Sequence, residues 1–427
     1  MSSVSELPLT VIKNFAGKPQ ETGNLLDLID AFRYLRNGCV GNEEFQSMLG
    51  ENPELVPNVN SILREISRKD CVDDDNAILC LTTALQFLGN FLVNNRKNQT
   101  TVWSICKDTL DKCLYVNNGK VQHCCLMIMY NVFLGNPQIL NSLTHSYEKV
   151  MEVAVSENFT EFAVFNIELF ISSSSYMRNF YNQLSVNSRL VILEEIQRLC
   201  EDQKGLHPIP TDVLEILSKQ FSKKADWILN KFKEDKDNLS VLEVVKILDV
   251  LVAFSNDDTN KRHYLEFMQK QVSLFIDLVS LLKAIHMLSR EKGNIFTMET
   301  KISESNDFFN SQCSPTFGFK AALIRIIGNM SWRNRNLQSI IRDMEGIQTI
   351  LDCCIIDAKN PFIMQWSILA IRNICEKNLE NQQIIAEMTK KGFIDIKLLK
   401  ENGILLHSEE IHCKSNAICM AALNINK

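Results

Sequence analysis

Histidine and cysteine, the residues that most often bind zinc, lie side by side at two places in the chain. These places are His123-Cys124-Cys125 and His412-Cys413. Adjacent side chains point in different directions from a helix, and no second pair follows at the spacing of a zinc finger. Free cysteine is commonly a small buried apolar residue, and the same interpretation applies to Cys353 and Cys354. We therefore predict no metal site.

Motifs of enzymatic chemistry are missing from the sequence. It contains no Walker phosphate loop, no dinucleotide-binding fingerprint and no Gly-x-Ser-x-Gly nucleophile elbow. The acidic run Asp73-Asp74-Asp75 fits a solvated loop or helix cap. Trp366 and Phe362 lie at the start of an apolar helical stretch, where packing explains them. The sequence predicts no catalytic residue and no cofactor, and hence a protein that is not an enzyme.

A recurring asparagine is the polar feature with the clearest pattern. In each copy an apolar residue stands two positions before the asparagine, a second asparagine follows after five residues, and a glutamine generally follows after nine. The first asparagines of the five copies are Asn37, Asn90, Asn131, Asn329 and Asn373. The copy at Asn131 departs from the pattern, because its glutamine, Gln138, comes two positions early.

Two roles for these asparagines are open. A side-chain amide both donates and accepts, so it can bond a backbone group of the adjoining repeat or the backbone of a bound, extended peptide. Arginines stand one or four positions before several of them. Guanidinium groups next to these asparagines would favour an acidic or phosphorylated ligand. The candidate partner-binding groove consists of Asn37, Asn90, Asn131, Asn329 and Asn373 with Arg33, Arg36, Arg325 and Arg372.

Helices must position this motif. The residues five and two positions before each first asparagine are apolar, and at about 100° per residue they lie on the side of a helix opposite the asparagine. The second asparagine is predicted to end that helix, and the glutamine to open the next. The first asparagines lie 53 residues apart from Asn37 to Asn90, 41 from Asn90 to Asn131, and 44 from Asn329 to Asn373. These spacings bracket the period of about 40–47 residues in armadillo and HEAT repeats. We predict an all-α fold, an armadillo/HEAT-like helical repeat superhelix of roughly nine or ten repeats.

Composition agrees with such an array. The 427 residues include 15 glycines and 9 prolines, about half of the roughly 12% that the two contribute to an average soluble chain. The formal net charge of −6 disfavours a nucleic-acid binder. No basic stretch leads into an apolar run at the start, the most apolar later stretch is interrupted by Asp277 and Lys283, and 14 cysteines suit a reducing compartment. We expect no signal peptide, no membrane span and a cytosolic or nuclear location.

Turn-forming and polar stretches divide the chain into five segments. Residues 1–200 are predicted to form N-terminal armadillo-like repeats, 201–211 a linker containing two prolines and a glycine, and 212–288 central, degenerate helical repeats. Residues 289–316 are polar and aperiodic, which is typical of a disordered loop. Residues 317–427 are predicted to form C-terminal armadillo-like repeats.

Two stretches of the sequence resemble the ataxin-10 family. They are Phe317-Gly318-Phe319-Lys320-Ala321-Ala322-Leu323-Ile324-Arg325-Ile326-Ile327-Gly328-Asn329 and the more specific Asn360-Pro361-Phe362-Ile363-Met364-Gln365-Trp366-Ser367-Ile368-Leu369-Ala370-Ile371-Arg372-Asn373-Ile374-Cys375-Glu376-Lys377-Asn378-Leu379-Glu380-Asn381-Gln382. The resemblance covers residues 317–402, which look like the family's C-terminal domain, with weaker similarity at 35–42. Residues 411–427 do not look like the family's usual ending, so nothing is carried over to them.

The resemblance implies an armadillo-repeat protein of the cytoplasm, including the perinuclear region and the centrosome or basal body. Family members are connected with neuron survival and neuron projection development, with cytokinesis in cell division, and with the cilium. The resemblance also implies binding to a heterotrimeric G-protein β subunit and to the O-linked N-acetylglucosamine transferase.

The function predicted from these observations is that of a non-catalytic scaffold or adaptor. It would bind other proteins, including extended or acidic peptide segments, on the concave surface of the repeat array. The alternative is a chaperone or nucleotide-exchange regulator of a GTP-binding protein. We expect no nucleic-acid partner, and a homo-oligomer is compatible with the sequence.

Overall fold

The computed structural model describes residues 6–17, 25–68, 74–201, 208–230, 239–256, 262–299, 316–390, 404–406 and 411–413. The chain forms two compact units. Unit 1 contains residues 1–196 and 204–210, and unit 2 contains residues 197–203 and 211–427.

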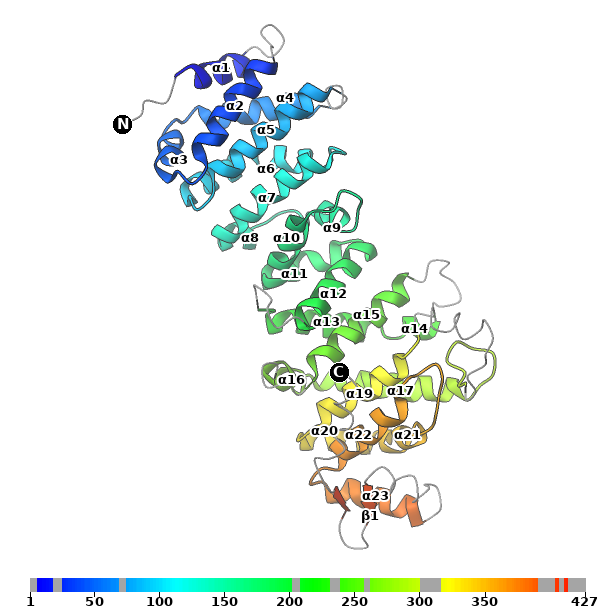
Figure 1. The fold of residues 1–427 in the computed structure, drawn as a ribbon. Coiled ribbons are helices and arrows are strands. Elements are labelled where there is room, and N and C mark those ends of the chain that lie inside the picture. Colours follow the sequence, from blue (N-terminus) through cyan, green and yellow to red (C-terminus); the bar gives the residue numbers. More distant parts are fainter. Residues whose placement is uncertain are drawn as a thin grey trace. The chain divides into compact units, whose positions relative to one another are not determined.

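Unit 1 is built from helices that begin and end as follows (Figure 1). They are α1 (Glu6–Gly17), α2 (Leu25–Cys39), α3 (Glu43–Gly50), α4 (Leu55–Ile66), α5 (Asp75–Phe91), α6 (Arg96–Leu114), α7 (Gly119–Gly135), α8 (Pro137–Asn141), α9 (Glu148–Ala154), α10 (Glu161–Ser172), α11 (Ser174–Phe180), the 3-10 turn η1 (Tyr181–Gln183) and α12 (Val186–Glu201), whose last turn crosses into unit 2.

Unit 2 continues in the same manner and adds a short strand pair. Its helices are α13 (Thr211–Lys224), α14 (Trp227–Asn230), α15 (Leu239–Phe254), α16 (Arg262–Met268), α17 (Val272–Ser289), α19 (Phe319–Ser331), α20 (Arg335–Asp343), α21 (Gly346–Asp352), α22 (Ile363–Cys375) and α23 (Leu379–Lys390). The strands β1 (Ile404–Leu406) and β2 (Ile411–Cys413) pair antiparallel, with Leu405 opposite His412.

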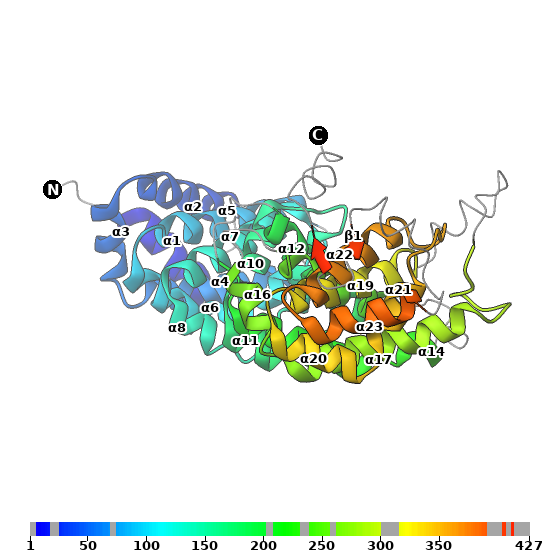
Figure 2. The same cartoon turned by 90° about the horizontal axis from the view of Figure 1, so that it is seen from below.

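Long helices alternate with shorter ones in both units. In unit 1 the long helices α2, α5 and α7 lie side by side, each packed on the next (Figures 1 and 2). In unit 2 the same relation joins α15 to α19 and α19 to α22. The five copies of the asparagine motif lie on α2, α5, α7, α19 and α22. The prediction of an all-α armadillo/HEAT-like helical repeat fold is confirmed, and the β1–β2 pair is the one non-helical element among the described residues.

The apolar side of each long helix forms the core. The residues five and two positions before the first asparagines are buried, as predicted, except Ile368, which is half-buried. Aromatic rings join successive long helices of unit 1, because Phe32 of α2 stacks on Phe87 of α5 with ring centroids 6.1 Å apart. Fully burying a side chain such as Leu or Phe stabilises a fold by about 1.5–3 kcal/mol, so this apolar side holds each repeat to the next.

One described helix, α17, is long and apolar enough to cross a membrane by length and composition. It contains Asp277 and Lys283, and within unit 2 it packs against α13, α19, α20 and α21. Its residues Leu278, Leu282 and Ile285 are buried there. A core helix of this kind passes the same length and composition test, so α17 is weak evidence for a membrane span.

The segment predicted to be a disordered loop is described as far as Glu299 and again from Thr316. Asn294 Nδ2 donates to the carbonyl oxygen of Leu288 (2.8 Å), Phe296 is buried, and Glu299 Oε1 pairs with Lys359 Nζ at 2.9 Å. The prediction therefore does not hold for residues 290–299, because one aromatic side chain and one turn-forming asparagine fix them on unit 2. Residues 300–315, like residues 202–207 of the predicted linker, lie outside the described residues.

Candidate functional site

The first asparagine of the motif binds the backbone of the preceding repeat. Asn90 Nδ2 donates to the carbonyl oxygen of Arg36 at 3.1 Å, and Asn373 Nδ2 donates to that of Gly328 at 3.1 Å. Arg36 and Gly328 lie in the last turns of α2 and α19, where carbonyl groups have no N–H partner inside their own helix. The amide thus satisfies a helix end in one repeat from the long helix of the next.

The glutamine of the motif donates in the opposite direction, from one repeat to the long helix of the following repeat. Gln46 Nε2 donates to the carbonyl oxygen of Asn90 at 2.8 Å, and Gln338 Nε2 donates to that of Asn373 at 2.9 Å. Each glutamine also donates to the carbonyl seven residues before it, at the end of its own long helix. Gln338 is only 1% exposed, so its bonds lie in a region where water cannot replace them.

A third amide, which the sequence analysis missed, completes this arrangement. Asn98 Nδ2 donates to the carbonyl oxygen of Gln46 at 3.1 Å, and Asn381 Nδ2 donates to that of Gln338 at 2.9 Å. These residues stand eight positions after Asn90 and Asn373. The other copies have Phe, Ile and Leu at that position, so the sequence offered too few examples to show a pattern. We call the bonds of these asparagines and glutamines the asparagine ladder.

The second asparagine of the motif begins a helix, and the prediction that it ends one is wrong. Its Oδ1 accepts from a backbone N–H three residues on, at 3.0 Å from Asn42 to Phe45, and the same bond recurs at Asn95, Asn334 and Asn378. This is the N-cap arrangement that satisfies a free N–H of the helix start. The residue before each of them has a left-handed backbone, with φ of 61° at Gly41, 56° at Asn94, 52° at Arg333 and 53° at Lys377. The turn therefore lies before the second asparagine.

The remaining first asparagines differ from one another. Asn329 Nδ2 donates to Ser255 Oγ at 3.0 Å and lies 3.4 Å from Asn256 Oδ1, across to the end of α15. Asn37 is exposed, and its Oδ1 accepts from Arg36. Asn131 is half-buried, and the described residues show no bond from its amide to another repeat. The contacts of Asn90 and Asn373 favour the structural role over the groove role, since those amides are already used.

The predicted arginines do not form one group. Arg33 pairs on the surface with Asp30 of its own helix at 3.0 Å, and Arg36 Nη1 donates to Gln86 Oε1 of α5 at 2.7 Å. Arg325 Nη2 donates to Asn256 Oδ1 at 2.9 Å, and its guanidinium lies 4.2 Å from the centroid of the Trp366 ring. Burial lowers the pKa of Arg325. Arg372 is half-buried on α22.

A face with aromatic and cationic side chains therefore extends over α15, α19 and α22 in unit 2. We define the cation–aromatic face as Asn256, Arg325, Asn329, Phe362 and Trp366. Phe362 is 59% exposed and has a left-handed backbone with φ of 59°, a conformation that costs energy for a bulky residue. Trp366 follows one helical turn later and is half-buried beneath Arg325. The prediction that Phe362 and Trp366 serve in packing is wrong for Phe362, because its ring is exposed.

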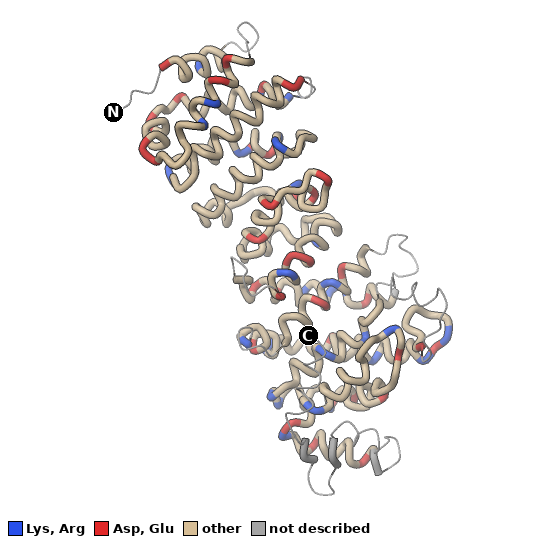
Figure 3. Tube along the Cα trace, in the orientation of Figure 1, with Lys and Arg blue, Asp and Glu red and all other residues tan. Residues whose placement is uncertain are grey.

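Charged residues of both signs are interspersed along the described parts of each unit (Figure 3). An electrostatic footprint for a nucleic acid would require lysines and arginines concentrated on one face. In the described residues the two signs of charge are instead mixed along the chain.

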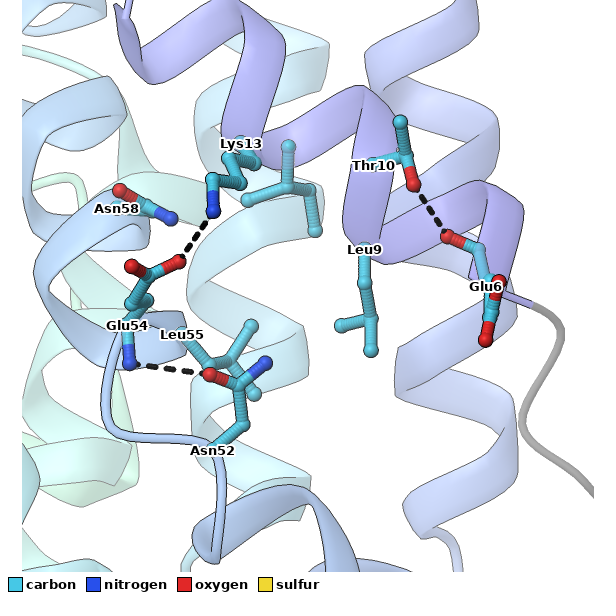
Figure 4. A pocket seen from close by; sticks show the side chains of 9 residues that line it. Glu6, Leu9, Thr10, Lys13, Asn52, Glu54, Leu55 and Asn58 are labelled. Atoms are coloured by element: carbon cyan, nitrogen blue, oxygen red, sulfur yellow. Dashed lines mark hydrogen bonds and ion pairs between the residues drawn. The ribbon is translucent and has the colours of Figure 1, made fainter.

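A small pocket opens at the N-terminal end of unit 1 between α1 and the start of α4 (Figure 4). Its volume is about 240 Å³, and the ion pair between Lys13 Nζ and Glu54 Oε2, 2.7 Å long, spans it. Both side chains are mostly exposed, so the pair contributes little stability. Neither a catalytic group nor a buried charge lines this pocket among the described residues.

Comparison with known proteins finds sequence similarity to the ataxin-10 family. The sequence pattern described as the spinocerebellar ataxia type 10 protein domain matches residues 319–415. Ataxin-10 of Bos taurus is 28% identical over 88% of this chain and 79% of its own length, and ataxin-10 of Homo sapiens is 28% identical over 90% and 82%. The ataxin-10 homolog of Dictyostelium discoideum is 48% identical over 20% of this chain and 14% of its own.

The similarity extends further than the sequence analysis expected. It covers most of both units, whereas the recognised stretches were limited to residues 317–402 and 35–42. The domain match also reaches residue 415, so residues 411–415 do not differ from the family in the way expected of the whole tail. A solved structure of an engineered protein aligns with a TM-score of 0.35 at 10% identity over 95% of this chain and 96% of its own, which is too distant to support an argument.

Proposed function

We propose that this chain, whose sequence similarity supports the ataxin-10 family, is a non-catalytic scaffold that binds other proteins on the exposed sides of its long helices. The cation–aromatic face of unit 2 is the observation that carries this proposal. Exposed aromatic side chains beside an arginine are the residues that most often dominate the binding energy of protein interfaces. Phe362 lies one helical turn before Trp366, whose ring stacks on Arg325, and it keeps a strained backbone while its own ring is exposed to water.

The chemistry of the face fits an extended, acidic segment of a partner. Arg325 supplies positive charge, and its flat stack on Trp366 can receive a carboxylate on its edge or an apolar side chain beside it. Resemblance to the family suggests two partners to test, a G-protein β subunit and the O-linked N-acetylglucosamine transferase. The cellular roles suggested in the same way are neuron projection development, cell division and function at the cilium, in the cytoplasm, the perinuclear region or the centrosome.

The cysteines of the described residues are consistent with a structural part in such a scaffold. Ten of them are buried. Burial raises the pKa of the thiols of Cys39 and Cys80 to about 12, and a protonated thiol is a poor nucleophile. No group of three or more metal-binding side chains is found in the part of the chain that the structure describes. The proposal therefore gives these two thiols a structural role.

Binding measured on a double variant tests the proposal. Phe362→Ala with Arg325→Gln removes the exposed ring and the charge, and we expect affinity for the G-protein β subunit or the transferase to fall by about tenfold or more. The matched control is Leu379→Ala, which removes an equally exposed apolar side chain elsewhere in unit 2. Unchanged affinity of the folded double variant for every partner that binds the unmodified protein would contradict the proposal.

One assay of nucleotide release distinguishes the scaffold from the alternative function. A chaperone or nucleotide-exchange regulator would accelerate the release of nucleotide from a GTP-binding protein, whereas a scaffold would leave the release rate unchanged.

A further inference from the structure

A second pocket in unit 2 is lined by charged side chains that the proposed scaffold function does not use. It lies between the end of α17, the turn that follows it, the start of α19 and the end of α21, and its volume is about 390 Å³. Its polar lining includes His286, Ser289, Arg290, Lys292, Lys320 and Asp352. A cavity of this size is typical of small-molecule sites in proteins.

Lys320 is a buried charge without a carboxylate beside it. The residue is 5% exposed, and its Nζ donates to Ser289 Oγ at 3.1 Å and to His286 Nδ1 at 3.2 Å. No carboxylate lies within ion-pair distance of this ammonium among the described residues. Lysines are almost never buried unless paired with an acidic group, because removing the charge from water is costly. The positive charge is therefore available to an anion that enters the pocket.

His286 offers a second N–H donor in the same pocket. An ammonium group can only donate, so the contact with Lys320 makes His286 Nδ1 the acceptor and leaves the ring hydrogen on Nε2. Burial, with the charges of Lys320 and Arg290 beside it, lowers the pKa of His286, so the ring is neutral at pH 7. Nε2 is buried with Asp352 Oδ2 3.4 Å away, so its hydrogen makes only a long contact with that carboxylate.

The mouth of the pocket carries two further cations. Arg290 and Lys292 are exposed there, and Arg290 Nη2 donates to Asp352 Oδ2 at 2.6 Å. Three cations and one carboxylate thus line the pocket, so its lining is positive overall. Met298 and Ile355 add an apolar wall. Such a site would attract a dianion that is attached to a small carbon group.

We propose that this pocket binds a phosphate monoester. A phosphate group carries nearly two negative charges at pH 7 and three acceptor oxygens. Its oxygens can accept from Lys320 Nζ and from the Nε2–H of His286, and Arg290 can turn from Asp352 to the phosphate, because guanidinium binds phosphate as well as carboxylate. The three cations and one carboxylate of the lining leave two net positive charges, and a ligand with a single carboxylate would neutralise only one of them. The phosphate group can belong to a phosphorylated side chain of a partner protein or to a free small molecule.

The test measures binding to the full chain by calorimetry and by ³¹P NMR with three probes. They are inorganic phosphate, glycerol 3-phosphate and a short phosphoserine peptide, with sulfate as the competing anion. We expect saturable binding of at least one monoester, and Lys320→Met should weaken it by about tenfold or more, because a hydrogen bond to a charged group is lost. Tighter binding of the peptide would identify a protein partner as the source, and tighter binding of glycerol 3-phosphate would identify a free metabolite.

Two further variants keep the result interpretable. Arg290→Gln with Lys292→Gln changes only exposed side chains and should weaken binding while leaving the fold intact. Lys219→Gln removes an exposed lysine of unit 2 that is paired with Glu215, far from the pocket in sequence, and should leave binding unchanged. Lys320→Met should also leave the melting temperature unchanged or raised, since an unpaired buried charge is replaced by an apolar side chain of similar length. Equal binding by all variants, or no binding beyond that of sulfate, would overturn the proposal.

Discussion

At the scale of the residue, the side-chain amides of the asparagine ladder decide how one repeat holds the next. The same set of bonds recurs in unit 1, from Gln46 to Asn90, and in unit 2, from Gln338 to Asn373. Each bond joins a side chain to a backbone carbonyl more than thirty residues away along the chain. Because these groups are buried, the ladder fixes the register of neighbouring long helices, and apolar packing alone would specify that register less strictly.

Gln338 is the residue at which this can be measured most clearly. Its amide bonds two backbone carbonyls, and its Oε1 accepts from Asn378 Nδ2 at 3.1 Å. Gln338→Ala should lower the free energy of unfolding by about 2–4 kcal/mol, because several buried groups lose their partner at once. Urea denaturation measures this loss. The control is the exposed Gln383, where alanine should change stability by less than about 0.5 kcal/mol, and similar values for the two variants would disprove the importance of the ladder.

Asp249 gives the protein a predictable response to pH. Burial raises the pKa of its carboxyl group to about 6, against a smaller opposite effect of Lys246. A raised pKa means that the ionised form is disfavoured in the folded state, so the stability contribution is full at low pH and is lost as the pH rises through about 6. Asp249→Asn should therefore stabilise the protein by about 1–3 kcal/mol near pH 8 and by little near pH 4. Denaturation curves at the two pH values test this, and a gain that is larger at the lower pH would contradict it.

At the scale of the element, the turn between a long helix and the next short one is the repeated device. A residue with a left-handed backbone is followed by an asparagine that caps the next helix. Gly41 takes this position without strain in the first copy, whereas Asn94, Arg333 and Lys377 take it at some cost in energy. The order of these residues explains why the second asparagine marks the start of a helix.

Gly41→Ala should lower stability by about 1 kcal/mol, because alanine disfavours a φ of 61° although no atom would contact its Cβ. Gly17→Ala is the matched control, since its Cβ would also contact nothing and its φ is not in the left-handed region. Thermal unfolding of both variants separates backbone strain from crowding. An equal effect at the two glycines would show that the left-handed turn is not the cause.

The helices were more predictable from the sequence than the contacts that join them. Apolar residues at positions five and two before each asparagine predicted buried sides that the structure has at Phe32, Leu35 and Ile327. The partner of Asn90 could not be predicted, because it is the backbone carbonyl of Arg36 and every residue has such a group whatever its side chain. The turn order was missed for the same reason, since Gly41 and Arg333 share a backbone angle and no chemical feature.

At the scale of the whole molecule, the repeat period predicted the class of fold, and chain composition excluded most alternatives. Neither predicted which side chains stay exposed. Phe362 and Trp366 read as core residues because they belong to an apolar helical stretch, yet the start of α22 leaves the ring of Phe362 in water. Exposure depends on whether another element covers that end of the helix, which is a property of tertiary packing and of no local pattern.

The central claim is that the asparagine ladder holds the repeats together while the cation–aromatic face binds partners. Asn373→Ala and Phe362→Ala, compared in one experiment of urea denaturation and partner affinity, test both halves. We predict that Asn373→Ala lowers the free energy of unfolding by about 1–3 kcal/mol and binds normally when folded. Phe362→Ala should change stability by less than about 0.5 kcal/mol and weaken binding. The opposite result, a stable Asn373→Ala variant that fails to bind beside a Phe362→Ala variant that binds normally, would contradict the account.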